Sequence, residues 1–144
     1  MDTDPLLLFR RAPKGLDRSR LRAFAETLRT RVANGHSFCA MLTGDDDVRD
    51  LNRYFLDKDE PTDVLSFPAR DPSESLGDIA ISWQRARAQA AGRGHSIEDE
   101  IEILMLHGLL HRQLGEGWTD LLHVADESET ARPTNLVLQL VDQS

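Results

Sequence analysis

The segment from Ser96 to about Leu114 most constrains the fold of this chain. Ser96 is followed by three acidic residues at positions 98–100, a pattern that predicts the first turn of a helix. The helix continues through residues 101–106, which read IEILML. Its second half is apolar on nearly every side, so neighbouring elements must cover it all round. We therefore expect a buried central helix around which the rest of the chain packs.

Weaker patterns predict the remaining elements. Short apolar runs bounded by Gly, Pro or Asn indicate strands over residues 6–9, 37–43, 64–67 and 78–83. Apolar residues at helical spacing indicate helices over residues 17–33, 45–56 and 84–91. In the second of these, the aspartates at 45–47 are expected to supply the N-cap and the first turn, and one face is expected to carry Val48, Leu51, Asn52 and Phe55. The tail from Thr134 fits either a helix or a strand. This mixed order favours an α+β fold in which the central helix and other helices pack against one small mixed sheet, as a single domain over residues 1–144.

The composition excludes several classes of protein. No stretch reaches the roughly 20 apolar residues that cross a bilayer, so we expect no membrane partner. The acidic start is unlike a signal peptide, and the single cysteine, Cys39, fits the reducing cytoplasm. The net charge of −8 excludes a protein that coats nucleic acid indiscriminately.

Two histidines, His107 and His111, are the most reactive feature of the predicted central helix. At a spacing of four residues they lie on the same side of a helix, where both imidazoles can bind one metal ion. Imidazole favours zinc over magnesium or calcium. The alternatives are that both rings are satisfied by hydrogen bonds inside the core, or that one ring is buried and the other exposed. Gly108 stands where zinc proteases of the H-E-x-x-H type carry their glutamate, so that class is disfavoured.

A catalytic zinc site needs a third protein ligand and an open position for water. The candidates are His36, His95, His123 or a carboxylate. His123 can return to the pair if the chain folds back after the helix; otherwise it is a surface residue. Glu100, seven residues before His107, shares its helix face and either orients an imidazole or caps the helix in solvent.

Three segments together resemble one family. They are the stretch from Leu51 to Pro68, which contains PTDVLSFP, the strand GDIAIS at 77–82, and HGLLH at 107–111. In this order they are similar to the bacterial YbeY family, single-strand-specific, metal-dependent endoribonucleases of rRNA maturation and ribosome quality control. The resemblance implies one zinc ion, held partly by the two helix histidines, beside a basic RNA channel. It also implies a cytoplasmic protein whose partners are single-stranded RNA, in particular small-subunit rRNA, and the ribosome or its proteins.

The chain departs from the family pattern at two places. The family's third histidine corresponds to position 117, which is glycine here; either an insertion moves the ligand to His123, or the ligand is lost, as a frameshift would cause. The family's arginine before the P-T-D motif corresponds to Leu56. Arg53 or Lys58 can stand in as the cation that neutralises a phosphate, or both are ordinary surface charges.

Basic residues are unevenly distributed. Eight lie in residues 1–35, and others are Arg85, Arg87 and Arg93, whereas carboxylates dominate residues 94–144. An acidic protein can therefore carry a basic channel, although solvated helix faces also explain the pattern.

The sequence supports a zinc-dependent single-strand-specific endoribonuclease as the first hypothesis. Zinc lowers the pKa of bound water towards ~7 and polarises a phosphoryl oxygen, which suits phosphodiester hydrolysis. The departures favour an alternative, a catalytically degenerate relative that binds ribosomal RNA or ribosomal protein without cleaving. A zinc hydrolase of another substrate is the third possibility, because Leu56 weakens the argument for phosphate.

Overall fold

The structure is a computed structural model that describes residues 6–59, 62–67 and 75–114. The tail from Thr134 lies outside these residues. The described elements are β1 (Leu7–Phe9), α1 (Arg18–Arg31), β2 (Ser37–Thr43), α2 (Asp45–Leu56), β3 (Val64–Phe67), β4 (Ser75–Ser82), α3 (Trp83–Arg93) and α4 (Ile97–Leu114).

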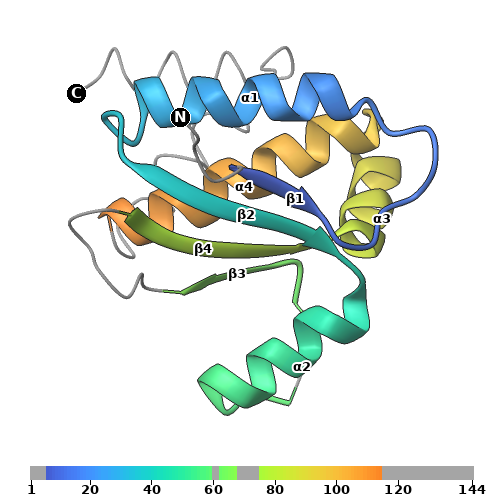
Figure 1. Cartoon of the computed structure of the whole chain (residues 1–144). Helices are drawn as coiled ribbons and strands as arrows, with labels where there is room; N and C mark the ends of the chain where they lie inside the picture. Colours follow the sequence, from blue (N-terminus) through green and yellow to red (C-terminus); the bar gives the residue numbers. More distant parts are fainter. Residues whose placement is uncertain (1–5, 60–61, 68–74, 115–144) are drawn as a thin grey trace.

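The four described strands form one mixed sheet in the order β1-β2-β4-β3 (Figure 1). Strand β2 pairs in parallel with both β1 and β4, while β3 runs antiparallel to β4. Helices interleave with the strands along the chain, and β1 and β3 are the edges of the described sheet. These features confirm the expected α+β fold with one small mixed sheet.

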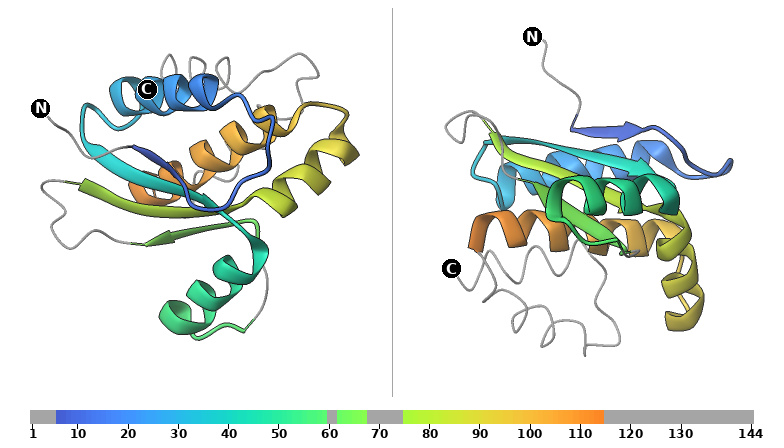
Figure 2. Two further views of the ribbon diagram at one scale, coloured as in Figure 1. Left: turned by 45° about the vertical axis from the view of Figure 1, so that its right-hand side comes forward. Right: turned by 90° about the horizontal axis from the view of Figure 1, so that it is seen from below.

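Helices cover the two faces of the sheet unequally. Helix α4 lies along one face together with α1, and α2 lies against the other face (Figure 1 and Figure 2). Because side chains alternate along a strand, Ile79 and Ile81 of β4 join the core on the α4 side, and Ala80 packs with Val48 of α2. Helix α4 is the buried central helix that its composition predicts. Its fully buried side chains include Ile101, Leu104, Met105, Leu106 and Leu109.

Some element boundaries differ from the expected ones. Trp83 was expected in the strand but begins α3, because the Ser82 side chain accepts a hydrogen bond from the Arg85 backbone N–H and caps the helix. Helix α3 also continues through Gly92 and ends at Gly94, whose φ of 73° is the left-handed conformation typical of helix ends. Within the part of the chain that the structure describes, no helix has the length and apolarity to cross a membrane.

Helix α2 departs from its predicted face. Its N-cap is Gly44 rather than an aspartate, and the three aspartates at 45–47 occupy its first turn. Val48 and Asn52 are buried as expected, but Phe55 is 60% exposed. The predicted apolar face of α2 therefore leaves the sheet at the C-terminal end of this helix.

An ionic contact joins α1 to the first turns of α4. The Arg20 guanidinium donates to both carboxylate oxygens of Glu102, at 3.1 and 3.0 Å, and to Asp99. Glu102 is only 3% exposed, and this burial raises the pKa of its carboxyl although Arg20 acts in the opposite direction. Partial burial would raise the pKa of Asp99 as well, but hydrogen bonds from Arg20 and Ser96 hold it below its usual value.

We expect Arg20→Met to lower the free energy of unfolding by about 1–2 kcal/mol near pH 7. This is less than the 3–5 kcal/mol of a fully buried pair because the Arg20 side chain is 35% exposed. Without Arg20 the pKa of Glu102 rises further. A carboxyl whose pKa is raised in the folded state destabilises the fold at pH values where it is ionised. The loss of unfolding free energy caused by Arg20→Met should therefore shrink as the pH falls towards about 5. Urea unfolding of the wild type and the variant, near pH 7 and again at about pH 5, measures this loss.

Arg29→Met is the matched control on the same helix. Arg29 pairs with Glu26 in an exposed contact at 2.9 Å, so its loss should cost no more than about 0.5 kcal/mol at either pH. An equal loss for both variants, or a loss for Arg20→Met that does not change with pH, would contradict the role given to Glu102.

Candidate metal-binding helix

The histidine pair flanks Gly108, a point at which the backbone of α4 contacts the sheet directly. A Cβ atom at Gly108 would meet Ile79 Cγ2 of β4 at 2.7 Å and Ser66 Oγ of β3 at 3.2 Å. The Ser66 hydroxyl donates a hydrogen bond to the Gly108 carbonyl at 2.9 Å. Glycine therefore allows the backbone beside His107 to contact the sheet directly. The three segments that resemble the family, which contribute Ser66, Ile79 and Gly108, meet at this point.

This contact positions His107. Its side chain is half-buried, and α4 continues without a break past His111 to Leu114. Four residues along an α-helix bring two Cβ atoms to the same side. The helix thus supplies the backbone geometry for two imidazoles that could share one ion.

The remaining ligands lie beyond what the structure describes. The side chain of His111 and the whole of His123 fall outside the described residues, so the third ligand stays a prediction. Among the residues that are described, no group of three or more His, Cys, Asp or Glu side chains is arranged to hold a metal ion. The chemistry of the pair still suits zinc, because both residues are imidazoles.

Glu100 has a partner other than the one that its spacing suggested. It is 1% exposed, and its Oε1 lies 2.7 Å from His95 Nε2. Its Oε2 lies 3.7 Å from Arg93 Nη1. Gly94 ends α3 and turns the chain so that His95 folds back onto the first turn of α4. The buried Glu100 carboxylate thus holds the half-buried imidazole of His95 rather than a ring of the histidine pair, and its burial shows that the alternative, capping in solvent, is wrong.

The predicted basic residues lie on α2. Arg53 and Lys58 are exposed at the C-terminal end of α2, and Leu56, at the family's arginine position, is 45% exposed. Arg53 is 3.5 Å from Asp50 in an ion pair whose partners are both more than 60% exposed, with values of 62% and 67%. Such a pair is weak, so Arg53 is free to exchange Asp50 for a phosphate.

Three further arginines lie on α3, beyond the C-terminal end of β4. Arg85 pairs with Asp45 at 3.1 Å, Arg87 lies 4.7 Å over the ring of Trp83, and Arg93 approaches Glu100. All three belong to α3, which joins the start of α4, whereas the histidine pair is near the end of α4 (Figure 1). These residues do not line a channel beside the histidine pair.

The basic N-terminal residues occupy another region. Arg18 and Arg22 of α1 lie over the ring of Phe9, at 4.7 and 4.9 Å from its centre. Arg10 and Arg11 are 3.4 and 3.6 Å from Asp47. These cations gather beside β1, at the edge of the described sheet opposite from β3.

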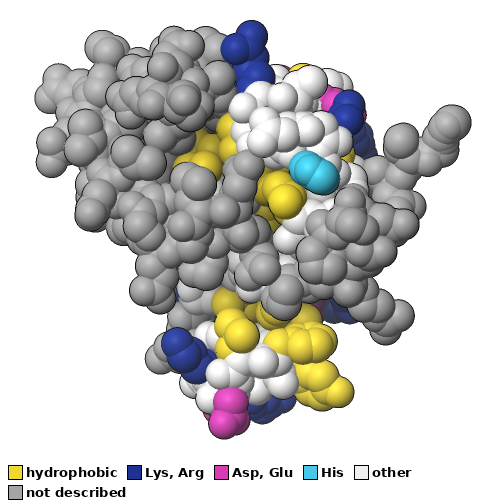
Figure 3. All heavy atoms as spheres, turned by 90° about the vertical axis from the view of Figure 1, so that its left-hand side faces the viewer, with side chains coloured by type: hydrophobic (Ala, Val, Ile, Leu, Met, Phe, Trp, Pro, Cys, Tyr) yellow, Lys and Arg dark blue, Asp and Glu magenta, His cyan; other side chains and the backbone are white. Residues whose placement is uncertain are grey.

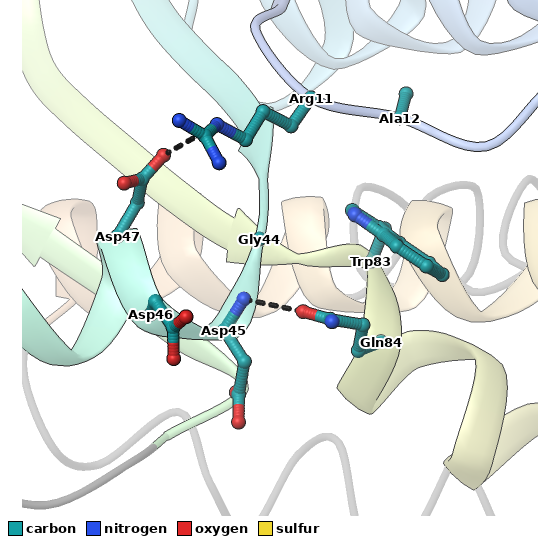
Figure 4. Close-up of a pocket in the computed structure, with 8 residues that line it drawn as sticks. All are labelled: Arg11, Ala12, Gly44, Asp45, Asp46, Asp47, Trp83 and Gln84. Atoms are coloured by element: carbon teal, nitrogen blue, oxygen red, sulfur yellow. Dashed lines mark hydrogen bonds and ion pairs between the residues drawn. The ribbon is translucent and has the colours of Figure 1, made fainter.

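A pocket of about 330 Å³ lies where β2 and β4 end (Figure 4). Two contacts join residues of its lining. The backbone N–H of Asp45 donates to Gln84 Oε1, and Arg11 pairs with Asp47. The pocket is not among the sites that the sequence predicts; its local signal is a strand followed by a glycine and acidic residues. It is lined by Arg11, Ala12, Gly44, Asp45, Asp46, Asp47, Trp83 and Gln84.

The fold and the histidine pair define an α+β protein whose buried central helix carries a candidate metal site beside an edge strand. Comparison with known proteins assigns the family. The model of the family described as "Endoribonuclease YbeY" matches residues 15–142, and the chain belongs to this family. The match extends beyond the helix histidines and includes the position of His123.

Individual relatives agree with this assignment. A Solibacter usitatus protein named Endoribonuclease YbeY is 56% identical over 103 residues, which cover 72% of this chain and 69% of that protein. A Thermus thermophilus protein of the same name is 38% identical over 127 residues, covering 81% of this chain and 91% of that protein. A solution structure of a Thermotoga maritima protein has the same fold, with a TM-score of 0.54 at 22% identity over 95% of this chain and 87% of that one.

Proposed function

We propose that this protein is a zinc-dependent endoribonuclease that cleaves single-stranded RNA in rRNA maturation and ribosome quality control, in the cytoplasm. The observation that carries the proposal is the match of the chain to the endoribonuclease family over residues 15–142. The direct contact of Gly108 with β3 and β4, which holds the histidine-bearing turn against the sheet, supports it.

His107 and His111 are the proposed zinc ligands from α4, and His123 is the proposed third ligand. When bound, zinc supplies a water of lowered pKa and polarises a phosphoryl oxygen. The chain's own contribution is position, because Gly108 and Ser66 fix the turn of α4 from which His107 projects. Arg53 and Lys58 are the proposed cations that neutralise phosphate charge, since their side chains are exposed and Arg53 is only weakly paired.

A second candidate function follows from Leu56 and from Gly117 at the family's third-histidine position. A relative without these groups would bind ribosomal RNA or ribosomal protein without cleaving it.

Metal analysis combined with a cleavage assay separates the two functions. We expect about one zinc per purified chain and cleavage of an end-labelled single-stranded RNA in preference to the same sequence as a duplex. Removing the metal with a chelator should slow cleavage to the rate without enzyme, a loss of at least roughly 10²–10⁴-fold, since a metal ion contributes several kcal/mol to the transition state, and added zinc should restore cleavage. RNA binding without zinc or turnover would instead support the degenerate relative.

A further inference from the structure

An aromatic patch is exposed at the C-terminal end of α2. We define it as Tyr54, Phe55 and Leu56 together with Phe67, the last residue of β3. The first three are 82%, 60% and 45% exposed. Hydrophobic side chains gather in the lower part of the molecule on the face shown in Figure 3, with charged side chains beside them. Large apolar side chains that adjoin on a surface mark an interaction site.

The rings of the patch are arranged edge to face and are anchored at one end. Tyr54 and Phe55 have ring centres 4.9 Å apart at 71°, and Phe55 and Phe67 have centres 5.3 Å apart at 62°. Phe67 packs against the small core formed by Val48, Leu65 and Ala80. Tyr54 is the outermost ring, and its high exposure leaves ring surface open to a flat partner.

The formal charges around the patch cancel. Residues 49–59 contain three basic and three acidic side chains, and Arg49 pairs with Asp59 at 2.9 Å. Lys58 makes no side-chain ion pair within the described part of the chain. A partner that binds here must gain most of its affinity from the rings, with one or two cations for phosphate. This is the combination by which proteins hold unpaired nucleic acid bases.

The patch is connected to the candidate metal site through β3. Phe67 follows Ser66, whose hydroxyl is bonded to Gly108, the neighbour of His107. Side chains alternate along a strand, so the patch and the histidine-bearing helix lie on opposite faces of β3. Because β3 is the edge of the described sheet, a flexible strand of RNA can pass around it from one face to the other.

We propose that Tyr54 and Phe55 form a stacking platform for one or two unpaired bases of single-stranded RNA, with Lys58 on the adjoining phosphate. This inference rests on the proposed function, because it names a contact of the same substrate. It explains how an acidic protein selects single strands: bases inside a duplex are already stacked and cannot reach these rings.

The test is the affinity of a labelled oligoadenylate decamer, measured by fluorescence anisotropy with the integrity of the RNA checked on a gel. Tyr54→Ala should weaken binding by about 10-fold or more, the usual effect of losing one stacked base, and Tyr54→Phe should bind like the wild type. A decamer without bases should bind weakly, and with equal affinity, to the wild type and to Tyr54→Ala. Leu8→Ala is the control, because Leu8 is 41% exposed on β1 at the other edge of the described sheet and should have no effect.

The dependence on salt separates stacking from charge. Lys58→Ala should reduce the slope of log affinity against log salt by about 0.7, the value for one phosphate of a single strand, whereas Tyr54→Ala should leave the slope unchanged. Thermal unfolding of each variant shows whether the fold is intact; Tyr54 should tolerate substitution because it is so exposed.

The outcomes distinguish this inference from the proposed function. Equal affinity of Tyr54→Ala and the wild type would overturn the platform, even if the wild type cleaves RNA. Tyr54-dependent binding by a protein that never cleaves would support the platform and reject the nuclease. If the wild type does not bind RNA but Tyr54→Ala abolishes self-association in light scattering, the patch is a protein interface and the platform is overturned.

Discussion

Replacing His107 by alanine is expected to reduce bound zinc to background and RNA cleavage to the rate without enzyme. The proposed site uses two imidazoles from one helix, and removing one of three protein ligands leaves too few to hold zinc. The measurements are zinc per chain in the purified variant and the cleavage rate of single-stranded RNA, both compared with the wild type.

Other histidine variants make this result specific. His111→Ala should have the same effect, whereas His36→Ala should have none, because His36 is exposed in the connection between α1 and β2. His123→Ala tests the third ligand: loss of zinc favours an insertion that has moved the ligand, and retention assigns the position to another group. Full activity in a zinc-free His107→Ala protein would falsify the proposed site.

Replacing Gly108 by valine is expected to cost about 3 kcal/mol of stability. A Cβ atom would lie 2.7 Å from Ile79 Cγ2, and Ile79 is 2% exposed inside the core. Overpacking a core costs about 1–3 kcal/mol or more, and displacing α4 also weakens the hydrogen bond from Ser66, worth about 1 kcal/mol. The higher helix propensity of valine returns only a few tenths of a kcal/mol. Urea unfolding measures the total.

Two matched variants identify the cause. Gly92→Ala, also inside a helix but with no atom within 4 Å of the new Cβ, should be neutral or slightly stabilising. Ile79→Ala removes the two Ile79 carbons, Cγ1 and Cγ2, that a Cβ at position 108 would meet. The double variant Gly108→Ala/Ile79→Ala should therefore lose about 1–2 kcal/mol less unfolding free energy than the two single variants lose in total. Ile79→Val keeps both carbons and should give additive effects. Additivity in both pairs would show that Ile79 is not the obstacle.

Local patterns were sufficient for most of the elements. The apolar composition of α4 predicts its burial, because no amphipathic face is available to turn towards water. The strands 37–43 and 64–67 have the predicted limits, since turn-forming residues stop them on the chain itself. The errors at Trp83, Gly92 and Phe55 share one cause. Capping and packing depend on which residues approach from elsewhere, and periodicity does not contain that information.

In the candidate site, too, local spacing predicts some features and only the fold explains the others. The spacing of His107 and His111 is enough to place both on one side of a helix, because the helical repeat is local. The pairing of Glu100 with His95 depends on the left-handed turn at Gly94, and spacing along one helix misassigned it. The role of Gly108 also required the fold, since its contacts are 29 and 42 positions away, at Ile79 and Ser66.

Local sequence patterns are enough to establish a buried central helix with two histidines on one side, and three short segments place the chain near one family. Three further facts required the fold: those segments meet at Gly108, the arginines of α3 lie away from the histidines, and three apolar side chains of α2 stay exposed. The two kinds of information differ in how far apart along the chain the interacting residues lie. Helical and strand periodicity arise from neighbouring residues, whereas close packing and ion pairing arise from residues that the fold alone brings together.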